Sequence, residues 1–228
     1  DNTYLYLGTD NGILVYNYRT DKYEQPDTDF PTDVRTMVLQ GDTLWIGSLN
    51  GLYTYQLKSR QLNHFDSKQT GLPHNTIYSI IHTKDNQIYI GTYNGLCRYV
   101  QASGKFENIL LPVNRGGSNL FVNSLLEDAA RQCIWIGMEG YLFQYNPTTG
   151  EMKAIEVFHN NSIKSLALDG DENLLAGTDN GLYVYQNDKE PLQHIIHDSR
   201  NIQSLTNNII WNIFSDQEHN IWHFPITL

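Results

Sequence analysis

The chain has 228 residues, of which 40% are hydrophobic, so it can bury a sizeable core. Its net charge of −10 and its scattered Lys and Arg residues argue against nucleic acid as a partner, because phosphate binding needs a basic surface. No run of about 18 apolar residues occurs, and the first residues, DNTYLYLGTD, lack the features of a signal peptide, so we expect this region to lie outside the membrane.

One ten-residue pattern recurs along the chain. GTDNGILVYN at 8–17 returns as GSLNGLYTYQ at 47–56, GTYNGLCRYV at 91–100, GMEGYLFQYN at 137–146 and GTDNGLYVYQ at 177–186. The first glycines of these stretches are roughly 40–45 residues apart, a period typical of four-stranded propeller blades. The sequence therefore predicts an all-β fold, a β-propeller of four-stranded antiparallel blades with about five to six repeats.

In chain order, the repeats are expected within one domain, 1–228. They span about 1–30, 31–70, 71–115, 116–158 and 159–198, with a partial repeat at 199–228. The third repeat shows the strands most clearly: TIYSIIHT at 76–83, IYIGT at 88–92, LCRYV at 96–100 and KFENILL at 105–111. No helix is predicted, since the apolar residues follow a period of two or occur in short runs.

The two ends of the chain contain incomplete repeats. The first repeat has the last three strands of a blade, and the last has the first one or two. The glycine of a sixth pattern would fall near 224, where the sequence has Phe224. The chain is therefore either part of a larger propeller, which we favour, or a five-bladed ring in which a strand near 208–215 completes the first repeat.

Asn-Gly pairs mark the reversal between the second and third strands of four repeats. They occur at 11–12, 50–51, 94–95 and 180–181. Such pairs are the strongest local signal for a hairpin, and we expect positive φ at both residues of each pair. Asp10 and Asp179 are expected to cap these turns. Gly140-Tyr141 stands in the fourth repeat instead, so its turn must differ.

Continuous apolar runs such as LWIG and IWIG predict strands covered on both faces. We expect Trp45 and Trp135 to pack between blades, and the following glycine to let neighbouring backbone approach. Cys97 and Cys133 lie in apolar strands and are expected to be buried free thiols, although a disulfide between them stays open. No CxxC or HExxH pattern occurs, so no metal and no cofactor are expected.

Two stretches resemble the two-component regulator propeller repeat: NTIYSIIHTKDNQIYIGTYNGLCRY at 75–99 and NIIWNIFSDQEHNIW at 208–222. DSRNIQSLTNN at 198–208 and TGLPHN at 70–75 are similar to the family's entry into a blade. The resemblance implies the periplasmic sensor region of a hybrid two-component system of the Bacteroides type, active in signal transduction as a homodimer. It also implies that oligosaccharides released from glycans are the signal, and that the kinase lies in domains absent from this chain.

Candidate ligand contacts lie where a propeller gathers the turns between second and third strands and the links between blades. The candidate ligand-binding residues are Tyr93, Arg115, Asn119, Glu139, Arg200 and His74. The Tyr93 ring could stack on a pyranose, and Arg115 or Arg200 could pair with a uronate or sulfate group. Simpler structural roles, such as a solvated His74, stay open.

Two other classes of function stay open. Glu139 and Asp179 could place two carboxylates across a pocket, as a propeller enzyme of the lyase or glycosidase type needs. No nucleophile elbow or phosphate loop accompanies them, so no catalytic residue is expected. The third class is a protein-binding scaffold, and the fold alone does not choose among the three.

Overall fold

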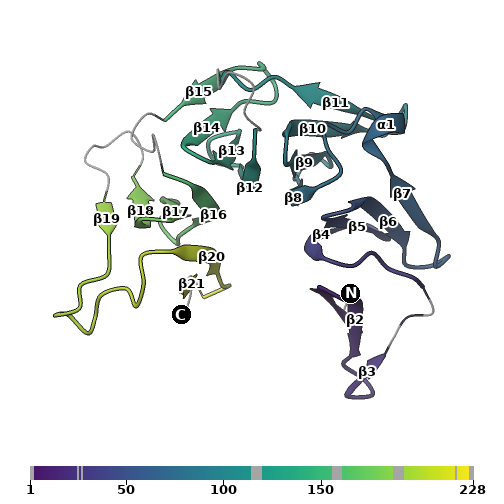
Figure 1. Cartoon of the computed structure of the whole chain (residues 1–228), viewed down its shortest axis with the longest axis horizontal. Helices are drawn as coiled ribbons and strands as arrows, with labels where there is room; N and C mark the ends of the chain where they lie inside the picture. The colour runs from purple at the N-terminus through teal and green to yellow at the C-terminus, as the bar shows by residue number, and fades with distance from the viewer. Residues whose placement is uncertain are drawn as a thin grey trace. The chain divides into compact units, whose positions relative to one another are not determined.

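The computed structural model describes residues 3–24, 26, 28–113, 120–155, 161–186, 193–218 and 220–225. Over these residues the fold consists of antiparallel sheets and one short helix (Figure 1). The chain divides into two compact units, Asp1–Phe121 and Val122–Leu228. Each unit contains sheets whose strands follow one another in chain order, as in propeller blades.

The first unit contains three sheets. The strands of the first are β1 (Tyr4–Thr9), β2 (Gly12–Asn17) and β3 (Lys22–Glu24). Those of the second are β4 (Val34–Gln40), β5 (Thr43–Ser48), β6 (Gly51–Gln56) and β7 (Leu62–Phe65), and those of the third are β8 (Ile77–His82), β9 (Ile88–Thr92), β10 (Gly95–Val100) and β11 (Lys105–Ile109). The first sheet thus has three strands, as the sequence predicts.

The second unit contains two four-stranded sheets and one two-stranded sheet. The first is β12 (Val122–Asp128), β13 (Cys133–Met138), β14 (Tyr141–Tyr145) and β15 (Met152–Ala154). The second is β16 (Ile163–Leu168), β17 (Leu174–Thr178), β18 (Gly181–Tyr185) and β19 (Gln193–Ile195), and the third is β20 (Ile210–Ser215) with β21 (Ile221–Pro225). Among the described residues of this unit, β20 pairs with β21 in a two-stranded sheet.

The prediction of no helix is wrong, because the structure contains one helix of a single turn. Helix α1 (Ser67–Thr70) lies in the link between the second and third sheets. The Asp66 side chain caps its first turn by accepting a hydrogen bond from the Lys68 backbone N–H, and Gly71 ends it in the left-handed conformation at φ 83°. None of the residues of this helix is buried, so it has no apolar face. Its start and end are set by the capping residues Asp66 and Gly71.

The Asn-Gly hairpins are correctly located, but their expected geometry is wrong. In the second sheet, Ser48 pairs with Gly51, so the two loop residues are Leu49 and Asn50 and the glycine begins the returning strand. Gly51 has φ 147°, whereas Asn50 does not have a positive φ. The other three Asn-Gly pairs have the same pairing, with positive φ at glycine alone. Glycine is often found at this fourth position of a tight turn.

The side-chain hydroxyl of the Ser or Thr residue that precedes each of these turns caps the turn, a role that was expected of Asp10 and Asp179. Ser48 Oγ donates to the Gly51 carbonyl and accepts from the Asn50 N–H, each at 3.1 Å. The same pair of bonds recurs at the other three Asn-Gly turns. In the fourth repeat Met138 pairs with Tyr141, and Gly140 has φ 78° inside the turn, so that turn does differ.

Successive sheets within a unit meet at the repeated glycine. A Cβ on Gly47 would lie 2.6 Å from Ile77 Cγ2 and 2.7 Å from Thr36 Cγ2. Ile77 is the first residue of the next sheet, so a β-branched side chain fills the space left by the missing Cβ. The same contact joins Gly8 to Val34, Gly137 to Ile163 and Gly177 to Ile210. The expected close approach is therefore made by a side chain and not by backbone.

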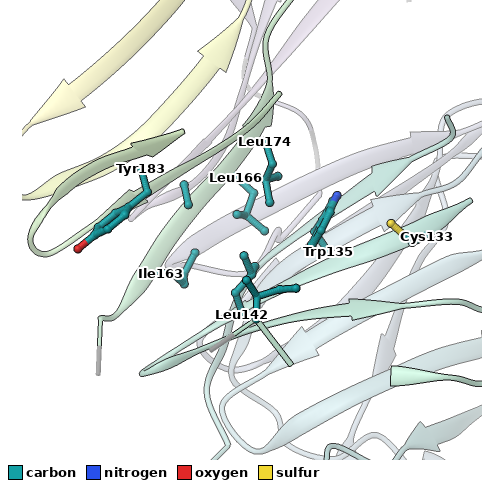
Figure 2. Close-up of a cluster of buried hydrophobic side chains, with 9 residues drawn as sticks. Cys133, Trp135, Leu142, Ile163, Leu166, Leu174 and Tyr183 are labelled. Atoms are coloured by element: carbon teal, nitrogen blue, oxygen red, sulfur yellow. The ribbon is translucent and has the colours of Figure 1, made fainter. Parts of the chain in front are cut away.

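Tryptophans pack between sheets, as predicted. Trp135 is 1% exposed and lies in a cluster with residues of the next sheet, including Ile163, Leu174 and Tyr183 (Figure 2). Its indole N–H donates to Asp128 Oδ2 at 3.0 Å, and Asp128 is itself fully buried and ion-paired with Arg131. The polar end of the indole is thus satisfied where its ring is buried.

Trp45 occupies the corresponding place in the second sheet. It packs against residues of the third sheet, and its indole N–H donates to Gln40 Oε1 at 3.0 Å. Both cysteines are buried and free, which confirms the expected thiols. Burial raises the pKa of the Cys97 thiol far above its usual range, so Cys97 remains a thiol at neutral pH.

We expect Asp216 to lose its unusual acidity when Trp222 is replaced by phenylalanine. Hydrogen bonds from the Trp222 indole at 2.9 Å and the Asn220 amide at 3.0 Å lower the pKa of Asp216 to about 2. Because the pKa is lowered, the carboxylate adds stability above the ordinary value of 3.8, and this contribution is lost as the pH falls through about 2. NMR titration should show a higher Asp216 pKa in Trp222→Phe and no change in a Phe224→Leu control. An unchanged pKa in Trp222→Phe would contradict this assignment.

Candidate functional site

Turns and links meet at one end of the sheets in each unit. The Asp33 N–H, in a link, donates to the Asp10 carbonyl, in a turn, at 3.0 Å. In the second unit the Gly140 N–H donates to the Asn161 carbonyl at 2.9 Å. These bonds fasten each turn between second and third strands to a neighbouring link, and we call this end of each sheet the turn-and-link edge.

Two of the candidate residues, His74 and Tyr93, are in contact at the turn-and-link edge of the first unit. Their ring centroids are 4.9 Å apart, and the Tyr93 ring also contacts Phe121 at 4.2 Å with an interplanar angle of 74°. Phe121 in turn lies 6.3 Å from Tyr78. We refer to His74, Tyr78, Tyr93 and Phe121 as the aromatic cluster.

Hydrogen bonds fix the orientation of this cluster. His74 Nδ1 accepts from the Thr76 N–H at 3.0 Å, so the ring proton of the neutral imidazole lies on Nε2. The Tyr93 N–H donates to the Thr76 carbonyl at 2.9 Å. Burial, followed by the nearby Tyr93, raises the pKa of Tyr78, while the charge of Arg35 acts in the opposite direction. The cluster thus presents half-buried rings and an imidazole N–H donor, which suit the faces and hydroxyls of a sugar.

The other candidate residues are not brought into this cluster by the described structure. Arg115 and Asn119 lie outside the described residues. Glu139 belongs to the second unit, where it is exposed and forms an isolated antiparallel bridge with Ser162. Arg200, also in the second unit, is exposed and pairs through Nε with Asp198 Oδ1 at 3.2 Å. Hydrogen bonds from the Arg200 backbone and side chain lower the pKa of Asp198.

The carboxylate of Asp179, considered for an enzyme site, has a structural partner. Asp179 Oδ1 accepts from the Ser162 N–H at 3.1 Å and so holds the link before β16. Among the described residues, no group of three or more His, Cys, Asp or Glu side chains is placed to hold a metal ion. No described helix is long and apolar enough to cross a membrane.

Sequence reasoning missed a pocket of about 360 Å³ between the first two sheets. It is lined by Tyr4, Tyr6, Val15, Glu24, Pro26, Thr28, Tyr55, Leu57 and Arg60. We call it the inter-sheet pocket. These residues occupy non-repeated positions and come from separate strands, so no motif joins them. The sequence feature that could have indicated this pocket was the high tyrosine content, with 15 tyrosines in the chain, but a β fold alone already explains it.

Residues 71–94, which include His74, Tyr78 and Tyr93, match the family model of the two component regulator propeller. The chain carries a two-component regulator propeller repeat. This match confirms the resemblance that the sequence motifs indicate, over the third sheet of the structure. The aromatic cluster thus lies largely within the matched propeller repeat.

Several relatives extend the comparison to the whole chain. Histidine kinase P4 of Formosa agariphila is 26% identical over 254 residues, which cover 96% of this chain and 17% of the kinase. The extracellular domain of BT4673 from B. thetaiotaomicron, described both as a one-component and as a hybrid two-component system, is 79% identical over 98% of this chain. Its TM-scores of 0.95 and 0.94 confirm the propeller fold class.

A more distant structure shows the fold alone. The extracellular domain of the hybrid two-component system BT3049 from B. thetaiotaomicron is 21% identical, with a TM-score of 0.77 over 96% of this chain. This chain spans 30% of the solved BT4673 and BT3049 chains. The matching family is that of a regulator, and no enzyme family is indicated for this region.

Proposed function

We propose that this chain is part of the extracytoplasmic sensor region of a hybrid two-component system. The observation that carries the proposal is the 79% identity to the BT4673 extracellular domain over 98% of this chain. This identity over almost the whole chain supports a shared role in signal reception. A periplasmic location, a homodimer and a kinase elsewhere in the protein belong to the same proposal.

The signal is an oligosaccharide derived from a glycan, and it binds at the turn-and-link edge of the first unit. Tyr93 supplies a ring for stacking on a pyranose, and His74 Nε2 donates a hydrogen bond to a hydroxyl. Arg115 and Asn119 belong to the link that ends at Phe121 and are proposed as further contacts. Glu139 and Arg200 are proposed as contacts in the second unit, where Arg200 must first release Asp198.

Calorimetry of this chain against a panel of glycan-derived oligosaccharides tests the proposal. We expect saturable binding without turnover, and a loss of about two- to tenfold in affinity in Tyr93→Ala, since one aromatic contact contributes about 0.5–1.5 kcal/mol. Tyr23→Ala is the matched control, because Tyr23 lies in β3 with 63% exposure, outside the aromatic cluster.

Thermal unfolding of both variants establishes that any loss of affinity is not a loss of fold. Product formation would instead indicate an enzyme. Capture of a protein partner without any saccharide binding would favour a scaffold. Saccharide binding that Tyr93→Ala leaves unchanged would remove the aromatic cluster from the proposal.

A further inference from the structure

The residues that line the inter-sheet pocket lie away from the turn-and-link edge. β6 starts at that edge with Gly51, so Tyr55 near its end, and Arg60 in the following turn, lie toward the opposite end of the second sheet. β1 runs the other way and reaches the turn at Thr9, which places Tyr4 and Tyr6 at the same distant end of the first sheet. The pocket is therefore a separate site from the aromatic cluster.

Packing and backbone hydrogen bonds fix two of the residues that line this pocket, Tyr55 and Arg60. Tyr55 is 6% exposed, and its ring packs edge-on against Phe30 with a centroid distance of 4.8 Å. Arg60 has φ 57°, and its N–H donates to the Gln56 carbonyl at 2.8 Å, so its backbone is held in the tight turn between β6 and β7. Such preorganisation lowers the entropic cost of binding.

Several polar groups line the pocket and keep hydrogen-bonding capacity for a ligand. Among the described residues, the hydroxyls of Tyr6 and Tyr55 and the guanidinium of Arg60 make no hydrogen bond to protein. Burial and the neighbouring phenols raise the pKa of Tyr6, against the opposing charge of Arg60, so this hydroxyl stays neutral and both donates and accepts. Glu24 accepts from the Asn17 amide through Oε1 at 2.8 Å, which leaves its second oxygen as an acceptor.

The charges in the lining of the pocket favour a ligand without net charge. Arg60 contributes one positive charge and Glu24 one negative charge, so the lining favours neither an anion nor a cation. Each hydroxyl of a sugar can both donate and accept a hydrogen bond. Neighbouring sugar hydroxyls can therefore accept from a guanidinium, donate to a carboxylate and do either with a phenol hydroxyl. Val15, Pro26 and Leu57 supply the apolar contact for the ring.

We infer that the inter-sheet pocket binds an uncharged saccharide of one or two rings, as a second carbohydrate site on this chain. Its volume of about 360 Å³ lies at the small end of the range of about 300–1,000 Å³ for ligand pockets. The saccharide class rests on the proposed function, but the site and the preference for an uncharged ligand do not.

The test is titration of this chain, followed by calorimetry and NMR, with glucose, galactose, mannose, arabinose and disaccharides of these sugars, alongside glucuronate and galacturonate. We expect the uncharged sugars to bind, and Tyr6→Phe and Arg60→Asn each to weaken this binding by about tenfold. Asparagine is used because it tolerates the left-handed backbone at position 60. Tyr23→Phe and Arg19→Asn, at exposed positions of the same sheet region, are the matched controls.

The outcomes separate the two proposals. Binding weakened by Tyr6→Phe and Arg60→Asn but not by Tyr93→Ala supports the inter-sheet pocket. Binding weakened by Tyr93→Ala alone overturns the pocket and leaves the proposed function standing. Equal or tighter binding of the uronates overturns the preference for an uncharged ligand, and failure of every saccharide to bind the folded chain overturns both proposals.

Discussion

Replacing Trp135 by alanine is expected to lower the free energy of unfolding by about 3–5 kcal/mol. The indole is 1% exposed and fills the space between two successive sheets of the second unit. Its removal leaves a cavity, and it also leaves the fully buried Asp128 without one of its donors. Urea denaturation of the wild-type and variant chains measures the difference.

Trp222 provides a matched control for Trp135. It occupies the corresponding place in the sixth sheet, and its indole donates to Asp216 as that of Trp135 donates to Asp128. However, Trp222 is 55% exposed, so Trp222→Ala removes far less buried surface. We expect it to cost less than about half of what Trp135→Ala costs. Equal losses would show that packing between sheets does not explain the effect.

Replacing Gly47 by alanine is expected to cost about 1–3 kcal/mol, although it adds only a methyl group. The new Cβ would lie 2.6 Å from Ile77 Cγ2 and 2.7 Å from Thr36 Cγ2, so two sheets must separate to accept it. Thermal and urea unfolding measure the loss. Combining Gly47→Ala with Ile77→Ala should give a smaller loss than the sum of the two single variants, because both act on one contact.

Gly41 separates this overpacking from the general effect of replacing glycine. It has φ 58°, and a Cβ added to it would meet no heavy atom within 4 Å beyond its chain neighbours. Gly41→Ala therefore tests backbone strain alone, which costs about 1 kcal/mol. If Gly41→Ala destabilised the chain as much as Gly47→Ala, the contact with Ile77 would not be the cause.

The repeat period and the Asn-Gly pairs were enough to predict the sheets, because both depend on local sequence. The sequence predicted a close approach at Gly47 but not its partner. That partner, Ile77, lies in the next repeat and occupies the space where a Cβ of residue 47 would be. Helix α1 escaped prediction because Asp66 and Gly71 define a single turn without any apolar period.

The candidate site was predictable only where it followed from topology. His74 and Tyr93 meet because a link and a turn share one end of the sheets. The pairing of Arg200 with Asp198 depends on loop conformation, which composition does not reveal. The inter-sheet pocket depends on how Tyr6 and Tyr55 face one another across two sheets, and no spacing in the sequence encodes that.

The short segment 74–77 has a mechanical consequence for the proposed sensor role. It carries His74 at one end and Ile77, seated over Gly47, at the other, while the Thr76 hydroxyl donates to the Leu49 carbonyl at 3.1 Å. A ligand that displaces the imidazole would break its hydrogen bond from the Thr76 N–H, and any resulting movement of Thr76 would pull on its bond to Leu49 in the second sheet. Strain at the proposed binding surface would then travel as a rigid displacement from one blade to its neighbour, without the unfolding of a loop.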